Sequence, residues 1–197
     1  MNDPAAIQHA SEMRSIRLHI DDGTPEQALK TLDERGAAQE LVRQQYSGRY
    51  PFELVQNADD AARDKGLRGR ARFVLTETAL LVADNGSGFG ERQIRAICSL
   101  ARSSKGPGTS IGHKGLGFKS VGEITNRPQI ISSSVQFQFD SARIYADLET
   151  VFGGLPSGQR VPAYAFPYPL TPEEFSADRV AVDSLRAEGF STIIRLP

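Results

Sequence analysis

The chain has few of the residues from which metal clusters and disulfide frameworks are built. It contains one cysteine, no tryptophan and three histidines in 197 residues. A single thiol, Cys98, excludes an internal disulfide framework and a thiolate metal cluster. The histidines, His9, His19 and His113, are far apart and lack the spacing of a histidine metal site. The apolar spacing around Cys98 predicts a thiol that packs in the core and does not act as a nucleophile.

Long apolar runs and an excess of charge of one sign are also missing. No apolar run approaches the roughly 18 residues that a membrane-spanning helix needs. The first residues, Met1-Asn-Asp-Pro-Ala-Ala, lack the basic and then apolar order of a signal peptide. The formal charge is −1, with basic and acidic residues spread along the chain, so neither a membrane partner nor a nucleic-acid partner is indicated. We therefore expect a cytoplasmic protein.

Three common catalytic signatures are absent as well. The chain has no Gly-x-x-x-x-Gly-Lys-Ser/Thr phosphate loop and no Gly-x-Gly-x-x-Gly dinucleotide fingerprint. It also lacks the Gly-x-Ser-x-Gly motif of a nucleophilic serine. Any nucleotide site in this chain must therefore be built differently.

The first segment that carries chemistry is Glu53-Leu-Val-Gln-Asn-Ala-Asp-Asp-Ala61. On a helix, Glu53 and Asn57 lie one turn apart on the same face, and Asp60 continues that stripe. An amide oxygen such as that of Asn57 is a suitable magnesium ligand when phosphates supply the others. The carboxylate of Glu53 is then placed to orient and deprotonate an attacking water. The alternative is the solvated polar face of an amphipathic helix.

The second segment is Asp84-Asn-Gly-Ser-Gly-Phe89, which follows an apolar run. The carboxylate of Asp84 can accept a hydrogen bond from the exocyclic amine of adenine. Gly86 and Gly88 allow the backbone to pass close to a flat ring, and Phe89 offers an apolar wall. The alternative is a plain Asp-Asn-Gly turn.

The third segment is a glycine-rich loop that leads into a predicted helix. Backbone N–H groups at such a helix start bind phosphate. Lys105 and Lys114 would add positive charge, although each is equally well explained as a solvated loop cation. The residues assigned here to nucleotide contacts are Gly112, His113, Lys114, Gly115, Leu116, Gly117 and Phe118, and we expect His113 to contribute its backbone.

The remaining pattern predicts an α+β fold, with helices layered on one face of a mixed, mainly antiparallel sheet. Residues 1–24 form an N-terminal arm or helix, and residues 25–197 form the main domain. Helices are expected at residues 25–34, 37–47, 50–65, 91–100, 115–123 and 173–187. Strands are expected at residues 71–76, 79–84, 129–133, 135–140, 143–148 and 191–196, and residues 101–111 form a loop.

Together and in this order, the three segments resemble the GHKL ATPase superfamily, which includes gyrase B, heat-shock chaperone ATPases, MutL proteins and sensor histidine kinases. The resemblance covers roughly residues 37–197. Within the superfamily, the segment Gly-His-Lys-Gly-Leu-Gly-Phe-Lys-Ser-Val is most similar to the sacsin and NO VEIN group of histidine kinase-like ATPase domains.

This resemblance implies a Bergerat-type α/β sandwich that binds ATP and Mg²⁺ between helices and sheet. Glu53 would be the general base, Asn57 the magnesium ligand and Asp84 the reader of the adenine amine. The family also places a threonine on a late strand beside that aspartate, and Thr192 fits. Residues 101–111 would form a lid.

The resemblance also bears on the type of activity. Sensor histidine kinases carry asparagine in place of Glu53, so ATP hydrolysis is favoured over phosphotransfer to histidine. Hydrolysing relatives receive a lysine or arginine from a following domain, which these residues lack. We therefore expect this chain to be the N-terminal part of a longer protein. We expect it to hydrolyse ATP slowly and to act as a chaperone-like switch, with the lysine or arginine supplied by a second copy or a downstream domain. The alternatives are a non-catalytic nucleotide-binding interaction module and a serine kinase of the anti-sigma type.

Overall fold

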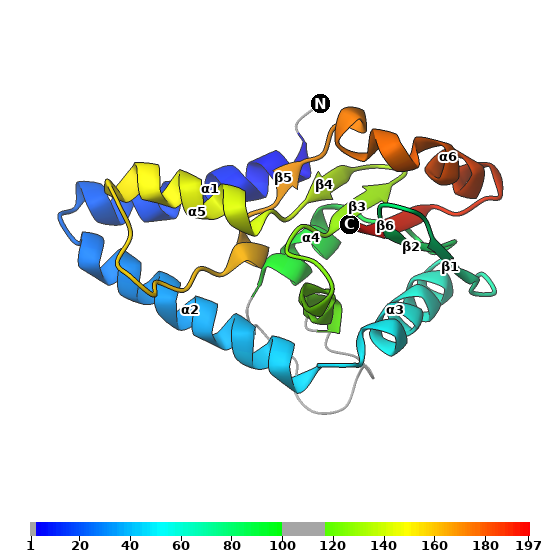
Figure 1. The fold of residues 1–197 in the computed structure, drawn as a ribbon, viewed down its shortest axis with the longest axis horizontal. Helices are drawn as coiled ribbons and strands as arrows, with labels where there is room; N and C mark the ends of the chain where they lie inside the picture. Colours follow the sequence, from blue (N-terminus) through cyan, green and yellow to red (C-terminus); the bar gives the residue numbers. More distant parts are fainter. Residues whose placement is uncertain (1–2, 100–116) are drawn as a thin grey trace.

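The computed structural model describes residues 3–99 and 117–197, which form an α+β fold around one six-stranded sheet (Figure 1). The strand order is β1-β2-β6-β3-β4-β5, and each neighbouring pair is antiparallel. The strands are β1 (Ala71–Leu75), β2 (Leu80–Asp84), β3 (Gln129–Ser132), β4 (Gln136–Gln138), β5 (Tyr168–Pro169) and β6 (Thr192–Leu196). The predicted fold class is confirmed.

Helices account for most of the remaining described chain. The α-helices are α1 (Pro4–Asp21), α2 (Pro25–Gln45), α3 (Tyr50–Asp64), α4 (Glu91–Cys98), α5 (Ser141–Phe152) and α6 (Arg179–Ala187). The 3-10 helices are η1 (Gly117–Glu123), η2 (Ala163–Ala165) and η3 (Pro172–Asp178). Among the described helices, none is both long enough and apolar enough to cross a bilayer.

The two faces of the sheet pack against different helices. Alternate residues of a strand point to opposite faces. On one face, Val82 and Ile194 join a buried cluster with Leu54 of α3 and Ile94 of α4. The other face packs against η3 and α6, through a cluster that includes Leu81, Ile193, Phe175, Val182 and Leu185. In Figure 1, α3 and α6 accordingly flank the strands from either side, so helices cover both faces of the sheet and not one face as expected from the sequence.

A third cluster joins α1, α2 and α5 beside the sheet. Ile16, Leu32, Ile144 and Leu148 are buried together there. Helix α1 also places Ala5 in the cluster that contains α3 and α4. The N-terminal segment is therefore a helix packed into the fold.

Helix α2 differs from the expectation of two helices that separate near Gly36. It runs without interruption from Pro25 to Gln45, and Gly36 lies within it. A Cβ on Gly36 would lie 2.8 Å from the backbone of Arg160 and of Val161. The glycine therefore serves a close approach between α2 and a distant segment, which sequence periodicity cannot reveal.

The prediction of a strand at residues 143–148 is wrong, because this stretch belongs to α5. Asp140 caps the helix by accepting a hydrogen bond from the backbone N–H of Arg143 at 3.0 Å. Ile144 and Leu148, four residues apart, are its buried side chains, and Gly153 ends the helix in the left-handed region. The helix expected at 115–123 is a 3-10 helix from Gly117, and the one at 173–187 is divided into η3 and α6.

Candidate functional site

The candidate site is built on one row of side chains along α3. Leu54, Ala58 and Ala62 are the buried side chains of this helix. Beside that buried stripe, Glu53, Asn57 and Ala61 follow one another at four-residue intervals, and all three are partly exposed. Side chains with this spacing stack along one face of a helix. Asn57 therefore lies between Glu53 and Ala61 on the same row.

A glycine lies against the Glu53 end of this row. A Cβ on Gly117, at the start of η1, would lie 2.0 Å from Oε2 of Glu53. The carbonyl oxygen of Gly117 also accepts a hydrogen bond from Ser120 Oγ at 2.6 Å. Any side chain on residue 117 would thus compete with the carboxylate for the same space.

A second glycine lies against the Ala61 end. A Cβ on Gly86 would lie 2.4 Å from Cβ of Ala61. The N–H of Ser87 donates to the carbonyl oxygen of Ala61 at 3.0 Å, which ties the turn to the helix. Two glycine segments that are distant in the sequence therefore contact the two ends of one helical row, with Asn57 between them.

Next to the Gly86 turn, three polar side chains lie side by side on the sheet. Asp84 at the end of β2 pairs with Thr192 on β6, which pairs with Ser132 on β3. On each of these strands, the residue two positions away is apolar and belongs to the cluster that packs on α3 and α4. These residues are Val82 on β2, Ile194 on β6 and Ile130 on β3. Because side chains alternate along a strand, all three polar side chains point to that same face. Thr192 thus lies beside Asp84, where the family resemblance predicted it.

Asp84 carries a perturbed carboxyl group. It is 9% exposed, and burial raises its pKa to about 6, while the Gly86 N–H acts in the opposite direction. That N–H donates to Oδ1 at 2.8 Å. No other group of the described residues forms a hydrogen bond with this carboxyl group. Its second oxygen, Oδ2, can therefore accept a hydrogen bond from a ligand.

The turn after Asp84 is held by serines that the sequence analysis did not assign. Ser132 Oγ accepts a hydrogen bond from the N–H of Phe89 at 2.9 Å, and Ser134 Oγ donates to the Phe89 carbonyl oxygen. Ser191 Oγ donates to the Gly86 carbonyl oxygen at 2.7 Å. The ring of Phe89 lies edge-on to Phe137, 5.8 Å between centroids. Serine is common in loops, so only the strand register identifies these residues.

Position 88 accommodates only a glycine without strain. Its φ is +78°, in the left-handed region, and a Cβ there would lie 2.9 Å from Ser132 Oγ. The two glycines of the turn are thus explained by contacts, since Gly86 meets α3 and Gly88 meets β3. These contacts define the path of the backbone past Asp84.

The other assigned residues divide into three groups. The side chain of Phe118 is 2% exposed and packs near Phe139 and Tyr164, so its ring belongs to the core. Asp60 lies on α3, with its carboxylate 3.8 Å from the guanidinium of Arg63. The residues that lie outside the described part of the chain are Lys105, Gly112, His113, Lys114, Gly115 and Leu116. In the described part, no cluster of three acidic, histidine or cysteine side chains is arranged to hold a metal ion.

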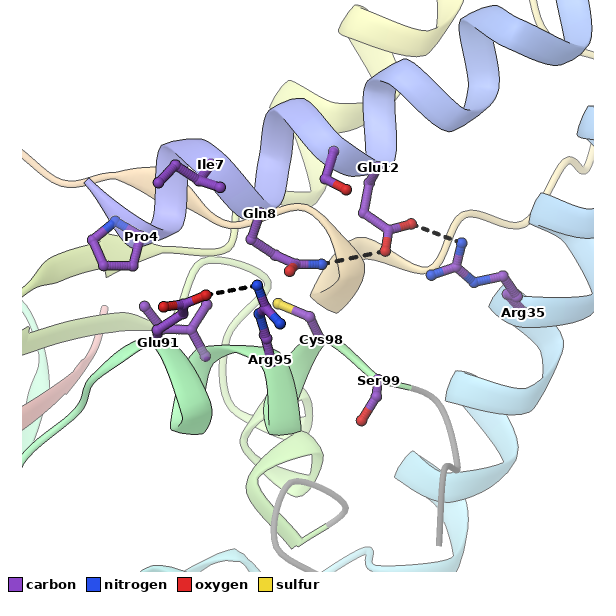
Figure 2. Close-up of a pocket in the computed structure, with 11 residues that line it drawn as sticks. Pro4, Ile7, Gln8, Glu12, Arg35, Glu91, Arg95, Cys98 and Ser99 are labelled. Carbon is purple, nitrogen blue, oxygen red and sulfur yellow. Dashed lines mark hydrogen bonds and ion pairs between the residues drawn. The ribbon is translucent and has the colours of Figure 1, made fainter. Parts of the chain in front are cut away.

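A cavity of about 580 Å³ lies elsewhere, between α1, α2 and α4 (Figure 2). Two ion pairs line it, Glu12 with Arg35 at 2.9 Å and Glu91 with Arg95 at 2.6 Å. Cys98 also lines it, and its thiol is buried as predicted. Burial raises the pKa of this thiol to about 12, which keeps it protonated and unreactive at neutral pH. The cavity shares no residue with the row on α3.

Comparison with known proteins gives one informative relationship. The chain is similar to the protein NO VEIN of Arabidopsis thaliana, with 40% identity over 104 residues. The matched stretch is 52% of this chain but only 4% of NO VEIN, so the chain corresponds to a small part of that relative. No family model matches the chain.

Proposed function

We propose that this chain is an ATP-binding domain of the GHKL type that hydrolyses ATP slowly in the presence of Mg²⁺. The observation that carries the proposal is the row on α3. Gly117 lies against Glu53 at one end, Gly86 lies against Ala61 at the other, and Asn57 lies between. This arrangement joins the three segments that resemble the superfamily, although they are far apart in the sequence.

The adenine end of the proposed pocket is the polar row on the sheet. Oδ2 of Asp84, to which no group of the described residues donates, is an acceptor for the exocyclic amine of adenine, and Thr192 lies directly opposite on β6. The buried surroundings of Asp84 strengthen a hydrogen bond made there, because the local dielectric is low. The similarity to NO VEIN supports a shared domain but by itself names no ligand.

The phosphate end of the proposed pocket lies at Glu53 and Asn57. The amide oxygen of Asn57 suits a single ligand position on magnesium, which takes its other ligands from water and phosphates. When bound, the ion would neutralise negative charge on the phosphates. The carboxylate of Glu53 would orient a water molecule and accept its proton as that water attacks the terminal phosphate. The contact with Gly117 restricts where this carboxylate can lie.

In this proposal, turnover stays slow until a lysine or arginine from another domain or a second copy reaches the terminal phosphate. Phosphoryl transfer is accelerated when a lysine or arginine stabilises the charge on the transferring group. We propose that a second copy or a downstream domain supplies it, so that nucleotide state governs association or conformation. The protein would then act as an ATP-dependent switch.

Calorimetric titration of the chain with ATP and ADP, with and without magnesium, tests this proposal. We expect magnesium-dependent ATP binding in the wild type, its loss in Asp84→Asn, and retained binding without turnover in Glu53→Gln. Equal binding by wild type and Asp84→Asn would remove the adenine assignment. Binding with no release of phosphate over many hours, with candidate partner domains present, would favour the non-catalytic interaction module. Transfer of labelled phosphate to a protein substrate would favour the serine kinase.

A further inference from the structure

Lys119 is a buried cation that none of the roles proposed above uses. It lies in η1, two residues after Gly117, and it is 0% exposed. Its Nζ donates a hydrogen bond to the carbonyl oxygen of Ser99 at 2.9 Å. Within residues 3–99 and 117–197, no carboxylate forms an ion pair with this ammonium group.

Such a side chain is costly, so its presence calls for an explanation. Removing an ammonium group from water costs several kcal/mol unless charge or hydrogen bonds compensate. A methionine of similar length would fill the same space without this cost. Strongly perturbed, buried ionisable groups are concentrated at functional sites.

The hydrogen bond of Lys119 connects two parts of the candidate site. Ser99 is the C-cap residue directly after α4, and the N-cap of α4, Gly90, directly follows the turn that runs from Asp84 to Phe89. Figure 2 shows Cys98 and Ser99 at this end of the helix, beneath α1. At the other end of the bond, η1 begins with Gly117, which lies against Glu53. A cation at a helix C-terminus also interacts favourably with the helix dipole.

We propose that Lys119 is a positioning residue of the nucleotide site: its ammonium group fixes the end of α4 to η1, and thereby the Asp84 turn relative to Glu53. This inference rests on the proposed nucleotide-binding function. Lys119 acts through Ser99 and Gly117 and does not itself touch the nucleotide. It is distinct from Lys105 and Lys114, which were assigned to phosphate contacts from the sequence.

The protonation state of Lys119 provides a direct readout. Burial lowers its pKa to about 8, and the positive charge of Arg35 on α2 acts in the same direction. Cys98 on α4 has the opposite effect, and from α3 the carboxylate of Glu53 lies against Gly117. A charged donor makes a hydrogen bond roughly twice as strong as a neutral one. The connection should therefore weaken as the pH rises from 7 to 9.

The experiment compares wild type with Lys119→Met, Lys119→Arg and, as an exposed control, Lys65→Met. Two quantities are measured: the affinity for Mg-ATP between pH 7 and 9, and the rate at which a thiol reagent labels Cys98 in the native protein. Cys98 is the only cysteine, so labelling reports the end of α4 alone. Loss of the Lys119 charge would by itself raise the pKa of the Cys98 thiol and slow its labelling, so faster labelling indicates movement.

We expect Lys119→Met to label at least tenfold faster and to bind ATP about tenfold more weakly, with Lys119→Arg intermediate and Lys65→Met unchanged. Wild-type affinity should fall several-fold between pH 7 and 9, and this fall should be absent in Lys119→Met. Leu148→Ala, in the distant cluster between α1 and α5, controls for a general loss of stability.

The proposal is overturned if labelling of Cys98 is unchanged in Lys119→Met, or if Leu148→Ala at equal melting temperature labels as fast. It is also overturned if Lys119→Met binds ATP as wild type does at every pH. If Lys119→Met does not fold, the pH profile of the wild type decides, and a constant affinity between pH 7 and 9 contradicts the role. If the wild type itself binds no ATP, the proposed function fails first, and the role of Lys119 fails with it.

Discussion

Gly117 and Glu53 occupy adjoining space so closely that a Cβ on the glycine would lie 2.0 Å from Oε2 of the glutamate. The contact joins the start of η1 to α3, two elements separated by more than 50 residues of chain. It also limits the positions open to the carboxylate that we propose as the general base. The close approach of Glu53, a side chain on another element, thus accounts for the glycine.

Gly117→Ala should therefore impair turnover more than folding. The added methyl group would displace the end of the Glu53 side chain, which is flexible, so the free energy of unfolding should fall by only about 1 kcal/mol. ATP turnover should fall at least tenfold because the carboxylate is moved. Gly69→Ala is the matched control, since its Cβ would meet nothing nearer than 3.4 Å. Urea denaturation and phosphate release measure the two effects, and equal turnover in both variants would contradict the role of the contact.

The raised pKa of Asp84 predicts a specific dependence of the free energy of unfolding on pH. Its pKa in the fold is about 6, above the usual value of an unfolded aspartate, so the fold favours the protonated form. Its contribution to stability is then greatest below about pH 4 and is lost as the pH rises to 6. The difference in pKa corresponds to about 3 kcal/mol. Asp84→Asn should remove this dependence, and denaturation of both proteins between pH 4 and 7 measures the difference.

Bound nucleotide should favour the ionised form of Asp84 and so lower its pKa. A hydrogen bond from adenine to Oδ2 is stronger when the carboxylate is ionised, so ATP should stabilise the protein most above pH 6. The increase in melting temperature that ATP causes should then shrink as the pH falls from 7 to 5. A stabilisation that is independent of pH, or that is equal in Asp84→Asn, would separate Asp84 from nucleotide binding.

The sequence identified what lies within single segments better than what joins them. The shared helical face of Glu53 and Asn57 and the Asp84 turn were predictable, because helix periodicity and turn chemistry are local. The contact of Ala61 with Gly86 was not predicted, because it joins two segments. Ser132 was not, because its role comes from the register of β3 with β6 and from the backbone of Phe89. Lys119 was missed for a similar reason, since its acceptor is the carbonyl oxygen of Ser99, 20 residues earlier.

The opposite face of the sheet offers a test of which polar residues belong to the site. Arg195, three residues after Thr192 on β6, points to the face that carries η3 and α6. Its Nε donates to Asp178 at 2.7 Å, and both side chains are almost fully buried. Asp178→Asn should lower the free energy of unfolding by about 3 kcal/mol, because it leaves a buried guanidinium without its counter-ion. Measured below its melting temperature, the folded variant should bind ATP as wild type does, whereas Thr192→Val should bind more weakly with a smaller loss of stability.

Gly36 allows two physical effects of opposite sign to be compared at one position. In a helix interior, replacing glycine by alanine normally stabilises by about 1 kcal/mol. At Gly36 the new Cβ would lie 2.8 Å from backbone atoms of Arg160 and Val161, which cannot move as a side-chain tip can. Overpacking of this kind costs about 1–3 kcal/mol, so Gly36→Ala should be destabilising on balance. Ala38→Gly, on the exposed side of the same helix, should cost about 1 kcal/mol through propensity alone. A stabilised Gly36→Ala protein in urea denaturation would mean that α2 does not approach the 160–161 segment as closely as described.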